Sequence, residues 1–186
     1  MRIGIPKERR PGETRVAATP ETVKKLVKAG HEVLVEREAG VASDITDAAY
    51  EEAGAQMVDT AGAFGAELVA KVRGPMEEEL PQLKAGSTLL GMLNPYHADG
   101  LARLAATGVT AFALEAAPRT TRAQSLDVLS SQANIAGYKA VLVAANLYQR
   151  FFPMMMTAAG TAKAARVVIL GAGVAGLQAI ATARRL

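Results

Sequence analysis

Residues 166–176 read Arg166-Val167-Val168-Ile169-Leu170-Gly171-Ala172-Gly173-Val174-Ala175-Gly176 and carry the strongest motif of this chain. An apolar run typical of a buried strand leads into three glycines spaced as GxGxxG, and the uncharged residues 177–183 favour a helix. In this arrangement the first glycine makes a tight turn, the second lets a pyrophosphate approach the backbone, and the third lets helix and strand pack closely. The motif predicts the start of a dinucleotide-binding domain.

The expected pyrophosphate contacts are backbone positions of this turn. They are Gly171, Gly173, Val174, Ala175 and Gly176. Free amides at the start of a helix attract negative charge, which suits a phosphate. The alternative interpretation is a glycine-rich turn of an α/β fold that binds no ligand.

Upstream of the motif, four glycines each follow an expected helix and precede a strand-like run. They are Gly30, Gly54, Gly86 and Gly108. Glycine accepts the left-handed conformation that turns a chain from a helix back toward a sheet. With further strands at 2–5 and 68–72, and a helix at 20–28 that Thr19 caps, the pattern predicts a parallel α/β layer within the first 115 residues.

Residues 126–148 contain no proline and a single glycine, Gly137, and their apolar residues recur with a helical period. One long helix is therefore expected, and its many small residues would permit the close approach of another element. Residues 150–163, interrupted by Pro153 and Gly160, should form an irregular connection to a strand at 166–170.

The expected fold class is α/β, with three parts in chain order. They are a parallel-sheet N-terminal domain at 1–125, a connecting helix at 126–150, and the beginning of a Rossmann-type dinucleotide-binding domain at 151–186. The acidic residue that binds the adenosine ribose in this motif follows the glycines by about 20 residues. Since that position lies past Leu186, we expect the second domain to be truncated and NADH binding by these residues alone to be weak.

Composition excludes several classes of protein. Of the 186 residues, 50% are hydrophobic and 21% are charged, which excludes a disordered chain. The absence of cysteine excludes disulfides and thiolate chemistry, and with only two histidines a zinc site is not expected. A net charge of +3 does not indicate a nucleic-acid or membrane surface. Residues 128–186 nevertheless carry six basic and no acidic side chains, which indicates either a buried segment or one that faces an anion such as pyrophosphate.

A second polar constellation spans residues 119–132. Gln124, Asp127 and Ser130 are spaced by three, so within a helical turn they would share one face. Together they could complement a carboxamide, which has two donors and an acceptor. Equally, the segment could be a capped helix start with a solvated loop.

Other polar residues are expected to have structural roles. His97 lies in a turn-like setting, which favours an exposed imidazole, and the acidic run Glu77–Glu79 resembles the solvated first turn of a helix.

Several stretches resemble a known family. They are Ile3-Gly4-Ile5-Pro6-Lys7-Glu8, Glu13-Thr14-Arg15-Val16-Ala17-Ala18-Thr19-Pro20 and Gly30-His31-Glu32-Val33. These stretches resemble the N-terminal domain shared by alanine dehydrogenase and the α subunit of proton-translocating NAD(P) transhydrogenase. Residues 119–138 are similar to the transhydrogenase in particular.

The resemblance implies a set of site residues and a reaction. Arg119, Gln124, Asp127 and Ser130 would surround the nicotinamide ring and carboxamide, Tyr138 would lie near the cofactor, and the glycine turn would hold the pyrophosphate. Gln124 and Asp127 would be the catalytic pair. NAD(H) bound to this chain would pass a hydride to NADP(H) on a partner subunit, and a membrane subunit would couple the transfer to proton translocation.

The same resemblance implies an assembly. The chain would form a homodimer, bind the membrane-domain and NADP-binding subunits, and be inactive without them. It would lie on the cytoplasmic side of the inner membrane, peripheral to it, with no nucleic-acid partner and no insertion of its own.

Two other functions remain open at this point. An NAD-dependent alanine dehydrogenase would need a carboxylate-binding group and a base, but this chain has Arg73 and Asn94 where that enzyme carries a substrate lysine and a histidine. Arg15 is retained, either for a substrate or for a structural ion pair. A regulatory module that binds a dinucleotide without turnover is the other possibility.

Overall fold

The computed structural model describes residues 1–118 and 120–186 and divides the chain into two units, Met1–Pro118 and Arg119–Leu186. Each unit has its own elements and its own packing. The domain limits expected at 125 and 150 stay a prediction.

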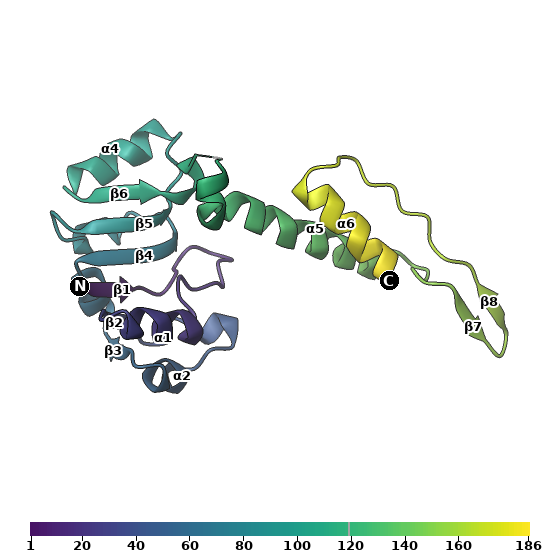
Figure 1. Cartoon of the computed structure of the whole chain (residues 1–186), viewed down its shortest axis with the longest axis horizontal. Coiled ribbons are helices and arrows are strands. Elements are labelled where there is room, and N and C mark those ends of the chain that lie inside the picture. Colours follow the sequence, from purple (N-terminus) through teal and green to yellow (C-terminus); the bar gives the residue numbers. More distant parts are fainter. Residues whose placement is uncertain (119) are drawn as a thin grey trace. The chain divides into compact units, whose positions relative to one another are not determined.

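The first unit is built on a six-stranded sheet with the order β3-β2-β1-β4-β5-β6 (Figure 1). Its strands are β1 (Arg2–Ile5), β2 (Glu32–Glu36), β3 (Gln56–Val58), β4 (Leu68–Arg73), β5 (Thr88–Met92) and β6 (Thr110–Ala113). Each neighbouring pair is parallel, with Ile3 opposite both Val33 and Leu68 in the central strands. This is the strand order of doubly wound α/β folds, and it confirms the parallel α/β prediction.

Helices alternate with these strands, and glycines with positive φ follow most of them. The helices are α1 (Pro20–Lys28), α2 (Asp47–Glu52), α3 (Thr60–Phe64) and α4 (Ala98–Ala106). Gly30, Gly54 and Gly108 close α1, α2 and α4 with φ values of 85°, 93° and 72°. The helix expected before Gly86 is wrong. A short 3-10 turn, η2 (Leu80–Gln82), stands there instead, with Pro81 inside it.

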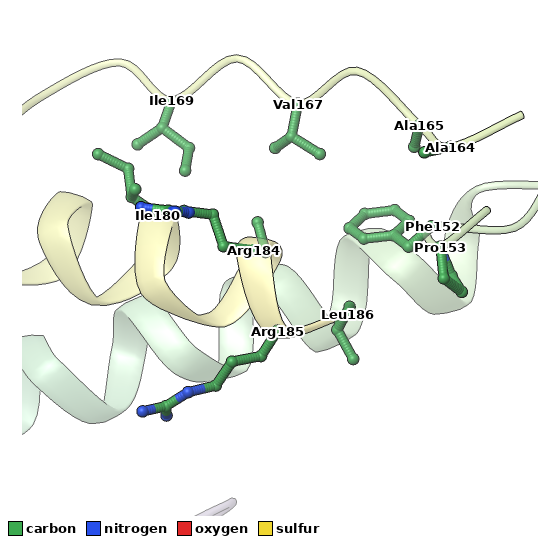
Figure 2. A pocket seen from close by; sticks show the side chains of 11 residues that line it. Phe152, Pro153, Ala164, Ala165, Val167, Ile169, Ile180, Arg184, Arg185 and Leu186 are labelled. Atoms are coloured by element: carbon green, nitrogen blue, oxygen red, sulfur yellow. The ribbon is translucent and has the colours of Figure 1, made fainter.

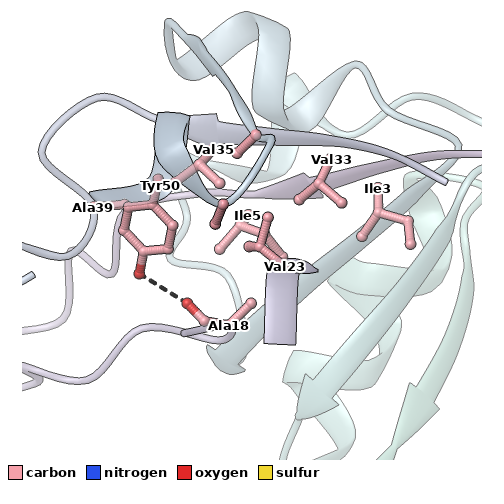
Figure 3. Close-up of a cluster of buried hydrophobic side chains, with 10 residues drawn as sticks. Ile3, Ile5, Ala18, Val23, Val33, Val35, Ala39 and Tyr50 are labelled. Carbon is pink, nitrogen blue, oxygen red and sulfur yellow. Dashed lines mark hydrogen bonds between the residues drawn. The ribbon is translucent and has the colours of Figure 1, made fainter. Parts of the chain in front are cut away.

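The core of the first unit lies on both faces of the sheet. One cluster packs β1 and β2 against Val23 of α1 and Tyr50 of α2, whose hydroxyl donates to the Ala18 carbonyl at 2.8 Å (Figure 3). The other gathers Phe64, Leu89 and their neighbours. Burial raises the pKa of Tyr50 to about 12. Because both faces are covered, the buried residues of β2, Val33 to Val35, are apolar without alternation.

The acidic run at Glu77–Glu79 is not the solvated helical turn expected from the sequence. The Glu79 side chain is 1% exposed and accepts a hydrogen bond from the buried Lys71 Nζ at 2.8 Å. Glu8 lies 3.7 Å from the same ammonium. Lys71 is in the middle of β4, where an ammonium without an anion would be costly, so the fold turns these carboxylates inward.

In residues 120–186 the second unit contains a short 3-10 turn, two packed helices and a hairpin. Its elements are the 3-10 turn η4 (Thr121–Leu126), α5 (Val128–Leu147), β7 (Met155–Thr157), β8 (Gly160–Ala162) and α6 (Val174–Arg185). The long helix is confirmed to within two residues at each end, and α6 packs along it. The segment expected to be irregular holds the antiparallel pair β7–β8, in which Met155 faces Ala162. Its strands are too short for a periodic signal.

The strand expected at 166–170 is also wrong. These residues have no regular secondary structure, since within the described chain no neighbouring segment supplies the ladder hydrogen bonds that define a strand. As for membrane segments, none of the helices in residues 1–118 and 120–186 has the length and apolar character to span a bilayer.

Candidate dinucleotide site

The three glycines of the motif, two before α6 and Gly176 in its first turn, differ in what constrains them. Gly171 has a φ of +115°, a backbone conformation that residues with a side chain rarely adopt. A Cβ on Gly176 would lie 2.1 Å from the Gly171 carbonyl oxygen, so close packing excludes a side chain there. Gly173 has an ordinary φ of −77°, and a Cβ on it would meet no described atom within 4 Å. Backbone conformation and packing explain two of the glycines, and Gly173 faces open space.

The start of α6 leaves backbone donors available. Gly173 is the N-cap residue, and the first helical bond runs from the Leu177 amide to its carbonyl at 2.9 Å. No side chain in the described part of the unit caps this end. The amides of residues 174–176 precede that bond, and the helix dipole adds positive potential there. With no carboxylate side chain in residues 128–186, this end suits a phosphate group.

Asp127 and Ser130 are brought into direct contact at the start of α5. Asp127 is the N-cap, and its two oxygens accept from the Ser130 amide at 2.9 Å and from the Ser130 hydroxyl at 2.7 Å. The capped helix start expected in one interpretation is therefore present. The same contact fixes a carboxylate and a hydroxyl side by side.

Gln124 lies in η4 and not in the helix that carries Ser130. Asp127 separates η4 from α5, because its ψ of 82° is not helical. Gln124, Asp127 and Ser130 therefore do not share one helical face. The Gln124 side chain is exposed and forms no hydrogen bond with the residues that the structure describes, so its amide can reach a ligand. Arg119 lies outside the described residues. Tyr138 is on α5 with a half-exposed ring.

Polar groups also gather at the carboxyl ends of the strands in the first unit. Arg15 pairs with Glu13 through two bonds of 2.7 Å and 2.6 Å, as one interpretation of Arg15 expected. These bonds hold the Glu13 pKa below its usual value. His97 is exposed, as expected, and its Nδ1 accepts from the Gly100 amide at 3.0 Å, which caps α4.

Several glutamates in the first unit bind backbone amides, and the sequence analysis missed the roles of Glu8 and Glu115 among them. Glu8 accepts from the Val72 amide at 2.6 Å, and Glu115 accepts from the Leu93 and Asn94 amides at 3.1 Å and 2.6 Å. Asn94 has a φ of 54°. No local pattern marks these pairings, because the partners are 21 to 64 residues apart.

A groove of about 510 Å³ lies beside the carboxyl-terminal half of α6 (Figure 2). Val167 and Ile169 of the segment before the glycine motif face Ile180 across it, and Arg184 and Arg185 are its charged lining residues. It contains none of the expected site residues, so we do not assign the dinucleotide to it.

Comparison with known proteins identifies relatives among both transhydrogenases and alanine dehydrogenases. Residues 4–136 match the family model described as alanine dehydrogenase/PNT, N-terminal domain, and residues 140–186 match the corresponding C-terminal domain. The whole chain is 52% identical to half of an NAD(P) transhydrogenase subunit alpha polypeptide of Rhodospirillum rubrum. Alanine dehydrogenase of Bacillus subtilis is 34% identical, over 96% of this chain and 48% of that protein.

Among solved structures, a transhydrogenase from Sinorhizobium meliloti superposes with a TM-score of 0.96 at 50% identity, over all of this chain and 56% of that one. The chain thus spans about half the length, or less, of the curated relatives that it matches.

Proposed function

This chain belongs to the alanine dehydrogenase/PNT family, and on that premise we propose that it is the NAD(H)-binding part of a proton-translocating NAD(P) transhydrogenase. NADH held here would pass a hydride to NADP⁺ on a partner subunit, an oxidoreductase reaction. A membrane subunit would couple the transfer to proton movement.

The observation that carries this proposal is the open space at Gly173. Backbone strain explains the glycine at 171 and close packing explains the glycine at 176, whereas nothing within the described protein requires a glycine at 173. A pyrophosphate that approaches the backbone would require it. The uncapped amides of residues 174–176 supply the hydrogen-bond donors for that ligand.

The polar groups near the start of α5 supply the other half of the proposed site. Hydride transfer between two nicotinamides moves no proton at the reacting carbons, so it needs positioning and not an acid and a base. Ser130 and the Asp127 carboxylate are fixed by their mutual bond, and the Gln124 amide is exposed. We propose that these groups, with Arg119 and Tyr138, orient the nicotinamide ring and its carboxamide.

The proposed partners are the membrane-domain and NADP-binding subunits, together with a second copy of this chain. The relatives named as subunit alpha support a multi-subunit assembly. The chain would then be peripheral to the inner membrane, on the cytoplasmic side.

An assay of the full-length protein tests the proposal. NADH should bind in calorimetric titration, and NADH-dependent reduction of an NADP⁺ analogue should occur only when the NADP-binding partner is added. Oxidation of alanine by the protein alone would establish the dehydrogenase instead. NADH binding without either reaction would establish a regulatory module.

A further inference from the structure

Helix α5 carries its single glycine where α6 crosses it. Gly137 is buried, and a Cβ built on it would lie 2.1 Å from the Ala175 carbonyl oxygen and 2.9 Å and 3.0 Å from the carbonyl carbon and Cα of the same residue. All three atoms are backbone, so they could not move aside as a flexible side chain would. The first turn of α6 therefore rests directly on the backbone of α5.

The same turn makes a second close approach. A Cβ on Gly176 would lie 2.1 Å from the Gly171 carbonyl oxygen. The peptide that joins Ala175 to Gly176 is thus tightly packed at both of its residues, with the Ala175 carbonyl against Gly137 and Gly176 against the Gly171 carbonyl. Its amide is one of the donors at the start of α6.

We propose that Gly137 is a positioning residue for the dinucleotide, an inference that rests on the proposed function. By leaving room for the Ala175 carbonyl, Gly137 sets the distance of the first turn of α6 from α5. That distance determines where the amides of residues 174–176 point. Gly137 acts through this turn and does not itself touch the pyrophosphate.

The contact also links the two halves of the site. Ser130 and Gly137 are seven residues apart on α5, or about 10 Å along the helix axis. One rigid helix thus spaces the Asp127–Ser130 pair from the phosphate turn. The interface continues one turn further, where Val141 and Ala179 are both buried.

The test is Gly137→Ala in the full-length protein, with the exposed α5 residue Ala140 changed to serine as the matched control. Alanine favours a helix over glycine, so α5 itself is not weakened by the change. NADH affinity should fall at least about tenfold, the loss expected for one hydrogen bond to a charged group. Ala140→Ser should bind NADH as the wild type does.

Hydrogen exchange distinguishes positioning from general loosening. In the wild type, saturating NADH should protect the amides of residues 174–177. In Gly137→Ala this protection should be lost, while exchange along α5 without ligand stays as in the wild type. Unchanged affinity and protection would overturn the inference, and so would faster exchange along both helices in the ligand-free variant.

A wild type that binds NADH without protecting residues 174–177, or does not bind it, would overturn the proposed function together with this inference. If Gly137→Ala does not fold, Ala179→Val adds bulk one turn along the same interface. It should weaken NADH binding less than tenfold but measurably, and wild-type affinity in that folded variant would also refute the role of the interface.

Discussion

The two units of this chain differ in how they bury their apolar residues. In the first unit, Ile5, Val33, Phe64 and Leu89 are 1% exposed or less, within a sheet covered on both faces. In the described part of the second unit, Val141 and Ala179 are the buried hydrophobic residues, while Leu170 is 95% exposed. The open glycine turn and the exposed Gln124 belong to this second unit.

From this difference we expect stability to depend mainly on the first unit and cofactor binding mainly on the second. The first unit has the core and the buried ion pairs, so substitutions there should act mainly on unfolding. The second unit has the groups that we assign to NADH, so substitutions there should act mainly on binding and rate.

The largest expected effect is on the buried charges of the first unit. Lys71→Met leaves Glu8 and Glu79 buried without their ammonium, which should lower the free energy of unfolding by about 3–5 kcal/mol. Urea unfolding measures this. The control is Lys25→Met, which breaks an exposed pair with Glu21 and should change stability little. Equal effects of the two changes would mean that burial does not distinguish these ion pairs.

The next effect is on rate, in the second unit. Gln124→Asn shortens the side chain by one methylene, and such a misplacement of the nicotinamide should slow hydride transfer about 100-fold. Asp127→Asn is the matched comparison, because asparagine can still cap α5, so its effect should be milder. Single-turnover transfer in the complete complex is measured beside NADH affinity. A rate loss fully explained by weaker NADH binding would refute the positioning role of Gln124.

A smaller effect is expected on affinity at the glycine turn. Gly173→Ala places a methyl in the open space beside the α6 amides and should weaken NADH binding at least about tenfold, with the melting temperature unchanged. Gly176→Ala should instead lower the melting temperature, because its Cβ meets the Gly171 carbonyl. Calorimetry and thermal unfolding of both variants decide this. A loss of stability in Gly173→Ala would show that the protein itself needs that glycine.

The smallest effect is a pH dependence of stability in the first unit. Burial raises the pKa of Glu8, and the nearby Glu79 adds to this rise. Lys71 and the backbone hydrogen bonds that Glu8 accepts oppose the rise. The folded state then binds this proton more tightly than the unfolded chain. The stability that Glu8 contributes by binding this proton is fully present below the ordinary glutamate pKa near 4.5. It is lost as pH rises through the pKa of Glu8 in the folded state.

The free energy of unfolding of Glu8→Gln should therefore rise relative to that of the wild type as pH increases above 4.5, and the difference should then level off. The pH dependence of stability from Glu13 has the opposite sign, because Arg15 lowers the pKa of Glu13. The stability that Glu13 contributes is lost as pH falls through that lowered pKa. Urea unfolding of Glu8→Gln and Glu13→Gln across this range tests both signs. A constant difference between Glu8→Gln and the wild type would contradict the raised pKa.

Local signals in the sequence were sufficient for the parts that depend on near neighbours. The positive φ at Gly30, Gly54 and Gly108, the cap of α1 by Thr19 and the length of α5 all follow from residues within a few positions. The α/β class followed because helix ends and strand-like runs alternate. The glycine turn was recognisable for the same reason, because the strained Gly171 and the close-packed Gly176 contact each other and lie within six residues of sequence.

Only the packed structure determined the contacts between distant residues. Glu79 is buried because β4 places Lys71 inside the sheet, and no pattern around Glu77–Glu79 contains that information. The segment at 166–170 shows the reverse, since an apolar run becomes a strand only when another backbone lies beside it. Likewise, Gly137 is an ordinary helical glycine in the sequence, and its meaning comes from the Ala175 carbonyl 38 residues later. Short-range conformational preference acts along the chain, whereas burial, ion pairing and close approach act through space.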